Sequence, residues 1–228
     1  MVVGNGMVAN NFAQYLDREN VIIFASGVSN SKLAFDSEFE REKNLLQKVL
    51  DENSGKKLIY FSTFNLFDPI EKNSPYCLHK LNMEEFIAKN VPFYNIFRIG
   101  HVAGQSAKQY TILSFLYNAI NDGSFFKLWR HASRNIIDIE DISKISSYII
   151  DNDLFPNQIT NICNSNNSTI LEIVAILEKI LSKKGNYSVF DEGGCPEVDN
   201  SKILGIAGDL GIHFDDSYVK NVIYKYYG

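Results

Sequence analysis

The chain has 228 residues, of which 45% are hydrophobic and 21% charged, with a formal net charge of −5 at neutral pH. This balance is typical of a globular protein with one large domain, or one domain and a smaller lobe. The acidic charge and the lack of a long basic run exclude a nucleic-acid partner from our expectations. No apolar run approaches the roughly 18 residues of a membrane-spanning helix, and no secretory leader is visible.

The three cysteines, Cys77, Cys163 and Cys195, are widely spaced. Such spacing fits neither a disulfide framework nor a metal cluster, so no metal is predicted. Free thiols are the rule in reducing compartments, and a cytoplasmic location is therefore predicted.

The chain begins with an apolar stretch followed by Gly4-Asn5-Gly6-Met7-Val8-Ala9 and a helical pattern through Leu16. This matches the G-x-G-x-x-G/A motif, in which glycines let the backbone approach a pyrophosphate at the start of a helix. Two features weaken the match. The strand before the motif is short, and the acidic residue expected about 20 residues on, for a ribose, is missing. An ordinary strand-to-helix turn is the alternative interpretation.

An apolar run at 20–25 predicts a second strand, followed by the small residues Ser26 and Gly27, which leave room for a ligand. A helix is predicted over 37–53, with an apolar face that includes Leu46 and Val49. The charged run from Glu38 to Lys43 within it is expected to be a solvated face.

The stretch from Leu58 to Ala88 predicts a buried strand that ends at Ser62-Thr63, a loop, and a helix carrying Tyr76 and Lys80. Residues four apart share one helix face, and an ammonium beside a phenol lowers the phenol's pKa. A pair of this kind predicts an acid/base group. The alternative is an ordinary half-exposed helix pair. Another strand is predicted at 91–99, and strands alternating with helices predict a parallel α/β sheet.

Further landmarks follow in the second half: an Arg-Ile-Gly-His segment at 98–101, Arg134-Asn135-Ile136-Ile137-Asp138, a strand and helix over 159–181, and Asp199-x-Ser201-Lys202. Taken in order with the glycine motif and the Tyr-x-x-x-Lys pair, they resemble the extended short-chain dehydrogenase/reductase family. Within it, the chain resembles the NAD-dependent epimerase/dehydratase branch, which works on nucleotide-linked sugars. The resemblance covers nearly the whole chain.

The resemblance implies a Rossmann-like doubly wound parallel sheet with a small C-terminal substrate lobe. The helix after Gly6 leads straight into what resembles the family's fourth strand, so the usual second and third strands are expected to be absent. The cofactor domain is then expected at 1–104 and 136–162, and the substrate lobe at 105–135 and 163–228. The lost strands normally cradle adenosine, which puts cofactor affinity in question more than catalytic geometry.

The resemblance also implies an NAD(P)-dependent nucleotide-sugar reductase or epimerase of polysaccharide biosynthesis, with NAD or NADP as cofactor, a nucleotide-sugar substrate and a homodimer. Tyr76 would be the acid/base, Lys80 would hold the nicotinamide ribose, and Thr63 would bond the same sugar oxygen. His101 and Arg134 would bind substrate. The cofactor would contact Gly4, Gly6, Met7, Val8, Ala25, Ser26, Gly27, Tyr76, Lys80 and Ile99.

Several alternatives stay open. Phe64 and Asn65 follow Thr63 where sugar dehydratases of this family carry Asp-Glu, which disfavours dehydration. A reduced relative that binds a nucleotide sugar or a partner enzyme without turnover is a second hypothesis, and an ordinary Rossmann protein that acts on small carbonyls is a third. Arg134 would otherwise form a surface ion pair with Asp138 or Asp141, and His101 would otherwise be a hydrogen-bonded structural residue.

Overall fold

The computed structural model describes residues 1–29, 36–105 and 111–228. Five parallel strands form the central sheet in the order β1-β2-β3-β4-β9. Their bounds are Val2–Val3, Val21–Phe24, Lys57–Thr63, Tyr94–Ile99 and Gln158–Ile162. The predicted α/β class with a parallel sheet is therefore confirmed, and each predicted strand of this sheet lies within a few residues of its expected place.

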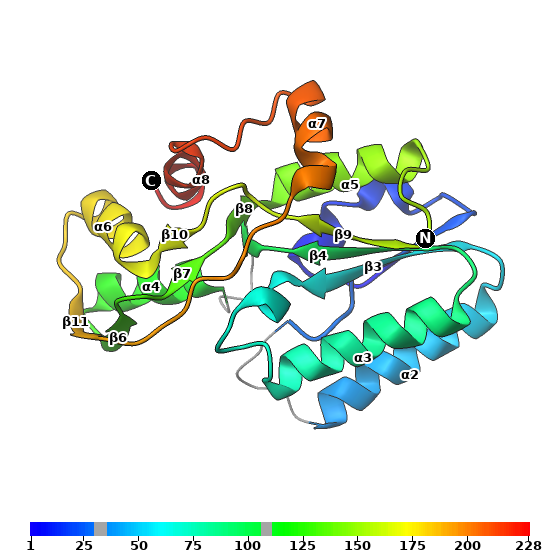
Figure 1. Cartoon of the computed structure of the whole chain (residues 1–228), viewed down its shortest axis with the longest axis horizontal. Coiled ribbons are helices and arrows are strands. Elements are labelled where there is room, and N and C mark those ends of the chain that lie inside the picture. The colour runs from blue at the N-terminus through cyan, green and yellow to red at the C-terminus, as the bar shows by residue number, and fades with distance from the viewer. Residues whose placement is uncertain (30–35, 106–110) are drawn as a thin grey trace.

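Helices cover both faces of this sheet (Figure 1). The long helices α2 (Asp36–Glu52) and α3 (Pro75–Asn90) lie side by side on one face, and α5 (Ile139–Asp151) lies on the other. Alternating strand residues explain the two layers, because successive side chains point to opposite faces. The core beneath α2 and α3 takes the even-numbered strand residues Ile22, Phe24, Leu58, Tyr60 and Ile96. The opposite core takes Val21, Ile23, Ile59, Phe61 and Phe97.

The first strand lies at one edge of the sheet and pairs with β2 alone among the described residues. In the usual doubly wound order the first strand is internal, with the second and third strands beyond it. The strand order of this sheet is therefore the one expected when the family's second and third strands are absent. The helix after Gly6 is shorter than predicted: α1 covers Met7–Asn10, and a 3-10 turn, η1 (Ala13–Tyr15), follows it.

Much of the second half of the chain builds a smaller lobe beyond the carboxyl ends of the strands, whereas its β9 and α5 belong to the central sheet and the layer that covers it (Figure 1). Three two-stranded sheets pair β5 with β8, β6 with β11 and β7 with β10. The remaining elements are η2 (Phe64–Phe67), β5 (His101–Ala103), α4 (Ile112–Asp122), β6 (Phe125–Trp129), β7 (Ser133–Arg134), β8 (Ile136–Asp138), β10 (Ser168–Thr169), α6 (Ile170–Leu181), β11 (Asn186–Phe190), α7 (Ser201–Asp209) and α8 (Tyr218–Tyr227). The sequence pattern also predicts a helix over 108–123. Residues 108–110 lie outside the described part of the chain, and α4 confirms the remainder of this helix.

Candidate functional site

The predicted cofactor residues lie where β1 and β2 end side by side. Gly4 has φ +130°, and a Cβ there would lie 2.6 Å from the carbonyl oxygen of Ala25. Gly4 thus lets the two strand ends touch, which any larger residue would prevent. Gly6 caps α1 with φ −86°, and a Cβ there would meet no atom within 4 Å. Gly6 therefore borders open space at the carboxyl edge of the sheet.

Thr63 and Tyr76 come together at the end of β3. Thr63 is the last residue of that strand, and its side-chain oxygen accepts a hydrogen bond from the Asn65 amide at 3.2 Å, which starts η2. Tyr76 lies in the first turn of α3, a helix capped by Ser74 and begun by Pro75. Their exposed fractions are 6% and 8%, so the pair is packed rather than open to solvent.

Lys80 does not complete this pair as expected. Its ammonium donates to Glu42 Oε1 at 2.9 Å and to the Tyr60 hydroxyl at 3.1 Å. Lys80 is 2% exposed and Glu42 is fully buried, and both lie in the layer between the sheet and the two long helices. Tyr60 points into the same layer because it shares the strand face that packs against α2 and α3.

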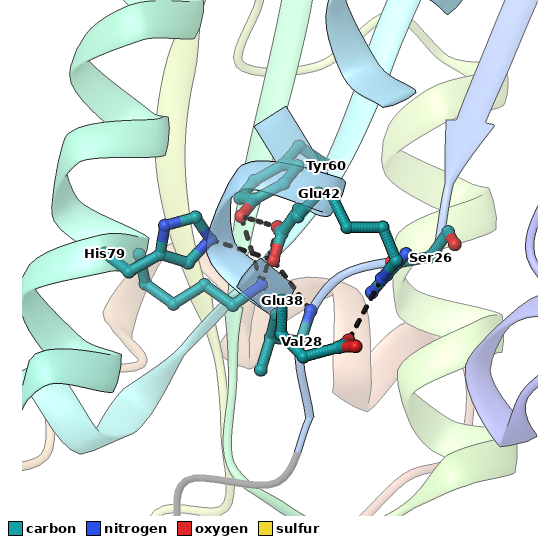
Figure 2. A network of polar contacts seen from close by, with 8 residues as sticks. Ser26, Val28, Glu38, Glu42, Tyr60 and His79 are labelled. Carbon is teal, nitrogen blue, oxygen red and sulfur yellow. Dashed lines mark hydrogen bonds and ion pairs between the residues drawn. The ribbon is translucent and has the colours of Figure 1, made fainter. Parts of the chain in front are cut away.

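Glu42 is the centre of a buried polar network, which Figure 2 shows around the end of β2. Its Oε1 also accepts from the Tyr60 hydroxyl at 2.6 Å, and its Oε2 accepts from the Val28 amide at 2.6 Å and contacts His79 Nε2 at 3.0 Å. Four partners satisfy one carboxylate. Burial alone would raise the pKa of Glu42, but these partners, with Lys80 the largest contribution, hold it well below its usual range.

The direction of the Tyr76 pKa is the reverse of the predicted one. Burial raises it well above the usual value of a phenol, the hydrogen bond with Thr63 opposes this, and the charge of Glu42 adds to the rise. Burial is the largest cause of this rise, and the Lys80 ammonium donates its hydrogen bonds to Glu42 and to the Tyr60 hydroxyl. The expectation that Lys80 lowers the pKa of Tyr76 is therefore wrong for this arrangement.

The charged run in α2 is also not a solvated face throughout. Glu42 shares a buried helix face with Leu46 and Val49, four and seven residues further on. That spacing could have shown from the sequence that Glu42 is buried, since it places the carboxylate on the apolar face of the helix. A carboxylate on a core face needs a buried partner. Tyr60 and His79 carried no such signal, because their partners come from other elements.

Arg134 lies on β7, and Nη1 contacts Asp68 Oδ2 at 3.3 Å and the Ser133 carbonyl oxygen at 2.7 Å. The predicted alternative partners, Asp138 and Asp141, instead bind Lys225 and Tyr218. The ion-pair interpretation therefore named the wrong carboxylates. The side chain of Arg134 is 15% exposed and that of Asp68 is 6%, so this pair is more sheltered than a surface salt bridge.

His101 begins β5 beside Arg134. Its Nδ1 is buried and has no hydrogen-bond partner among residues 1–29, 36–105 and 111–228. Burial and the nearby Arg134 charge lower the pKa of His101 to about 3, so the ring is neutral near pH 7. The Ser133 hydroxyl is also buried and finds no hydrogen-bond partner in the part of the chain that the structure describes. The substrate-side residues predicted from the sequence thus lie close together. A hydrogen bond with the Asn135 backbone acts on the His101 ring, whereas Nδ1 has no partner among the described residues, so both interpretations of His101 stay open.

Among the described residues, no His, Cys, Asp and Glu side chains gather in a group of three that would hold a metal ion. Within the same part of the chain, no helix has the length and apolar character needed to cross a bilayer.

Comparisons with solved structures place this fold among those of the NAD-dependent nucleotide-sugar epimerases and dehydratases, which confirms the predicted resemblance at the level of the fold. No family model matches the sequence, and no curated protein does.

Three of these structures illustrate the likeness. UDP-glucose 4-epimerase of Thermus thermophilus, in complex with NAD, has a TM-score of 0.70 at 13% identity, over 97% of this chain and 82% of its own. UDP-glucose 4-epimerase of Thermotoga maritima, with UDP-glucose, has a TM-score of 0.69 at 16% identity, and the match covers 95% of this chain and 78% of that one. UDP-glucuronic acid 4-epimerase of Bacillus cereus, with UDP-glucuronic acid and NAD, has a TM-score of 0.69 at 18% identity, and the match covers 91% of this chain and 74% of that one.

Proposed function

We propose that the protein is an NAD(P)-dependent nucleotide-sugar reductase or epimerase in which Tyr76 moves a proton to or from a sugar oxygen. The observation that carries the proposal is the hydrogen bond between Thr63 and Tyr76 at the carboxyl edge of the sheet. Solved structures with a similar fold include epimerases bound to NAD and to a UDP-sugar. Ligands of open α/β sheets bind at this edge.

The residues present fit a dinucleotide at its pyrophosphate. Gly6 borders open space, and Gly4 lets the backbone of this loop lie directly on Ala25. The loop backbone would approach the phosphates, while Ser26 and Ile99 would lie along the strand ends. The nicotinamide would give or take the hydride. An edge strand of two residues leaves the adenosine without the strands that flank it in the family, which favours weaker cofactor binding.

On the substrate side, Arg134 and His101 would bind the nucleotide sugar. A guanidinium fork suits phosphate oxygens, and a neutral imidazole with an unpartnered Nδ1 suits a hydroxyl. Phosphates would compete with Asp68 for Arg134. A homodimer is also part of the proposal, and Leu78 and Leu81 on the outer side of α3, 47% and 36% exposed, support it.

The test is turnover and cofactor binding by the purified protein. NADH and NADPH fluorescence titrations should show binding, and UDP-sugars should be converted. Tyr76→Phe should lower turnover by about 10²–10⁴, the usual worth of a general acid, without loss of fold by circular dichroism. The control is Tyr224→Phe, since Tyr224 is exposed on α8. Full activity of Tyr76→Phe would refute the role of Tyr76.

A second candidate function is nucleotide-sugar binding without redox turnover. The Lys80–Glu42 contact favours it, because two of the three N–H donors of the ammonium are used inside the protein. A ribose diol held by two donors would have to displace one of these partners. Binding of UDP-sugars with no binding of either reduced nicotinamide cofactor at millimolar concentration would decide for this function.

A further inference from the structure

The cationic side chains near the carboxyl ends of the strands differ in how fully the protein itself occupies them. Arg98, on β4, binds Glu84 through two contacts, Nε to Oε1 at 2.9 Å and Nη2 to Oε2 at 2.6 Å. A forked contact of this kind is the strongest that a guanidinium makes with a carboxylate. The Lys80 ammonium is held by Glu42 and by the Tyr60 hydroxyl. These two cations are therefore committed to the fold.

Arg134 is occupied on one side only. Its Nη1 donates to Asp68 Oδ2 at 3.3 Å and to the Ser133 carbonyl oxygen at 2.7 Å. In the part of the chain that the structure describes, Nε and Nη2 of Arg134 donate no hydrogen bond. The guanidinium therefore keeps one edge of two N–H donors, and such an edge matches two oxygens of a phosphate group.

The Asp68 carboxylate is anchored independently of Arg134. Its Oδ1 accepts a hydrogen bond from the Ile70 amide at 2.9 Å, while Oδ2 is the oxygen that contacts the guanidinium. The next residue, Pro69, lies against the lobe, because a Cβ added to Gly194 would be 2.7 Å from its Cγ. The loop thus holds the carboxylate beside Arg134, and these anchors do not depend on which partner the guanidinium takes.

We infer that Asp68 is a specificity-determining residue, whose carboxylate occupies Arg134 in place of a ligand phosphate, so that only a group able to bond two N–H donors at once displaces it. The inference rests on the proposed function and deepens it, because it names the chemistry that the substrate needs at this position. A diphosphate has that chemistry, since it offers several oxygens and more than one negative charge. A sugar or nucleoside without phosphate cannot displace the carboxylate.

The Asp68–Arg134 pair gives the inference a sign that can be measured. The side chains are 6% and 15% exposed, and removing one partner of a sheltered ion pair is destabilising. The same removal frees Arg134 for a phosphate. Loss of the Asp68 charge should therefore make the ligand-free protein less stable and, at the same time, make it bind phosphate ligands more tightly. A purely structural role of Asp68 would lower stability without raising affinity.

The experiment titrates the purified protein with UDP by isothermal titration calorimetry. Asp68→Asn keeps an oxygen for the Ile70 amide and removes the charge. We expect this variant to melt at a lower temperature than the wild type and to bind UDP at least about tenfold more tightly, the usual size of one charged hydrogen bond. Uridine, which has no phosphate, should bind both proteins equally.

The role of Arg134 is tested by a double-mutant cycle. In an Arg134→Ala background, Asp68→Asn should change the UDP affinity little, because the carboxylate then has no cation to occupy. The matched control is Asp191→Asn, which removes a carboxylate that is 81% exposed and pairs with Arg130. This control should bind UDP as the wild type does.

A folded Asp68→Asn protein whose UDP affinity is equal to or below that of the wild type would overturn the inference. A gain that persists undiminished in the Arg134→Ala background would do the same, as would the absence of UDP binding by every variant at millimolar concentration. If Asp68→Asn does not fold, Asp68→Ser takes its place with the same expected results, since a hydroxyl also offers an oxygen to the Ile70 amide.

This readout needs no nicotinamide, so its failure is distinguishable from that of the proposed function. A protein that binds no NADH but gains UDP affinity in Asp68→Asn supports the role of Asp68 and refutes the oxidoreductase. Turnover of UDP-sugars without a gain in UDP affinity in Asp68→Asn supports the oxidoreductase and overturns the role of Asp68.

Discussion

Glu42 and Lys80 form an ion pair of 2.9 Å in which the side chains are 0% and 2% exposed. Removing water from two charges is costly, and the cost is recovered only where geometry and further hydrogen bonds are good. Here Tyr60 bridges the pair and Val28 and His79 complete the carboxylate. The lysine predicted from the Tyr-x-x-x-Lys motif is thus held by the protein's own core.

Replacing one member of this pair should destabilise the protein strongly. Lys80→Met leaves the Glu42 carboxylate buried without its cation, and we expect a loss of about 3–5 kcal/mol in the free energy of unfolding. The double variant Lys80→Met with Glu42→Leu should cost less than the sum of the two single changes. Urea denaturation followed by circular dichroism measures all three.

The control for this cycle is the exposed pair Lys48–Glu52, whose side chains are 71% and 61% exposed. Lys48→Met should change the unfolding free energy by less than about 1 kcal/mol, as is usual for surface pairs. Additive effects of Lys80→Met and Glu42→Leu would show that the two residues do not act as a pair.

His101 should make the fold sensitive to mild acid. Its pKa is about 3 in the folded protein because of burial and Arg134, against roughly 6.5 in an unfolded chain. The unfolded state therefore takes up the proton first. The stabilising contribution is complete above about pH 6.5 and is lost as the pH falls toward 3.

His101→Gln should remove this component, so that the unfolding free energy of the variant falls less between pH 7 and pH 4 than that of the wild type. Denaturant melts at the two pH values measure the difference. His213→Gln, at an exposed position, should lose stability with pH as the wild type does. Equal pH dependence in the wild type and His101→Gln would contradict the buried, neutral ring.

Arg134 should matter for nucleotide sugars more than for stability. Arg134→Ala removes the proposed phosphate contact, and a charged hydrogen bond is worth about 1.5–3 kcal/mol, so UDP-sugar affinity should fall roughly 10- to 100-fold. Isothermal titration calorimetry measures it. The control is Arg130→Ala, whose side chain is 56% exposed and pairs with Asp191. Unchanged affinity in Arg134→Ala would favour the small-carbonyl hypothesis.

The sequence predicted what depends on local pattern. Strand and helix alternation, the order of motifs and the shortened connection from Gly6 to β2 were sufficient for the class of fold and for the place of Thr63 and Tyr76. It did not predict the environment of Lys80, because Glu42 lies 38 residues away and meets it across two helices. The Asp68 partner of Arg134 is 66 residues away. A motif predicts on which helix or strand a residue lies. The partners of its side chain, and therefore its protonation, depend on tertiary packing between elements that are distant in the sequence.

The two glycines of the first motif offer a test that separates folding from binding. Gly4→Ala should destabilise the protein, because φ is +130° and the new Cβ would lie 2.6 Å from the Ala25 carbonyl oxygen, an atom of the backbone. Gly6→Ala should leave stability almost unchanged, because φ is −86° and its Cβ would meet nothing within 4 Å. If a pyrophosphate fills that space, however, the added methyl group would collide with it.

We therefore expect Gly6→Ala to melt like the wild type and yet to bind NADH at least about tenfold more weakly, a difference of about 1.4 kcal/mol. Thermal melts and fluorescence titrations of the same preparations give both numbers. Gly205→Ala is the control, since its Cβ also meets no atom within 4 Å and it lies on α7, which packs against β9 at the opposite edge of the sheet from β1. Unchanged NADH affinity in Gly6→Ala would place the dinucleotide elsewhere or exclude it, because a ligand lying on this loop must feel a methyl group in the space it occupies.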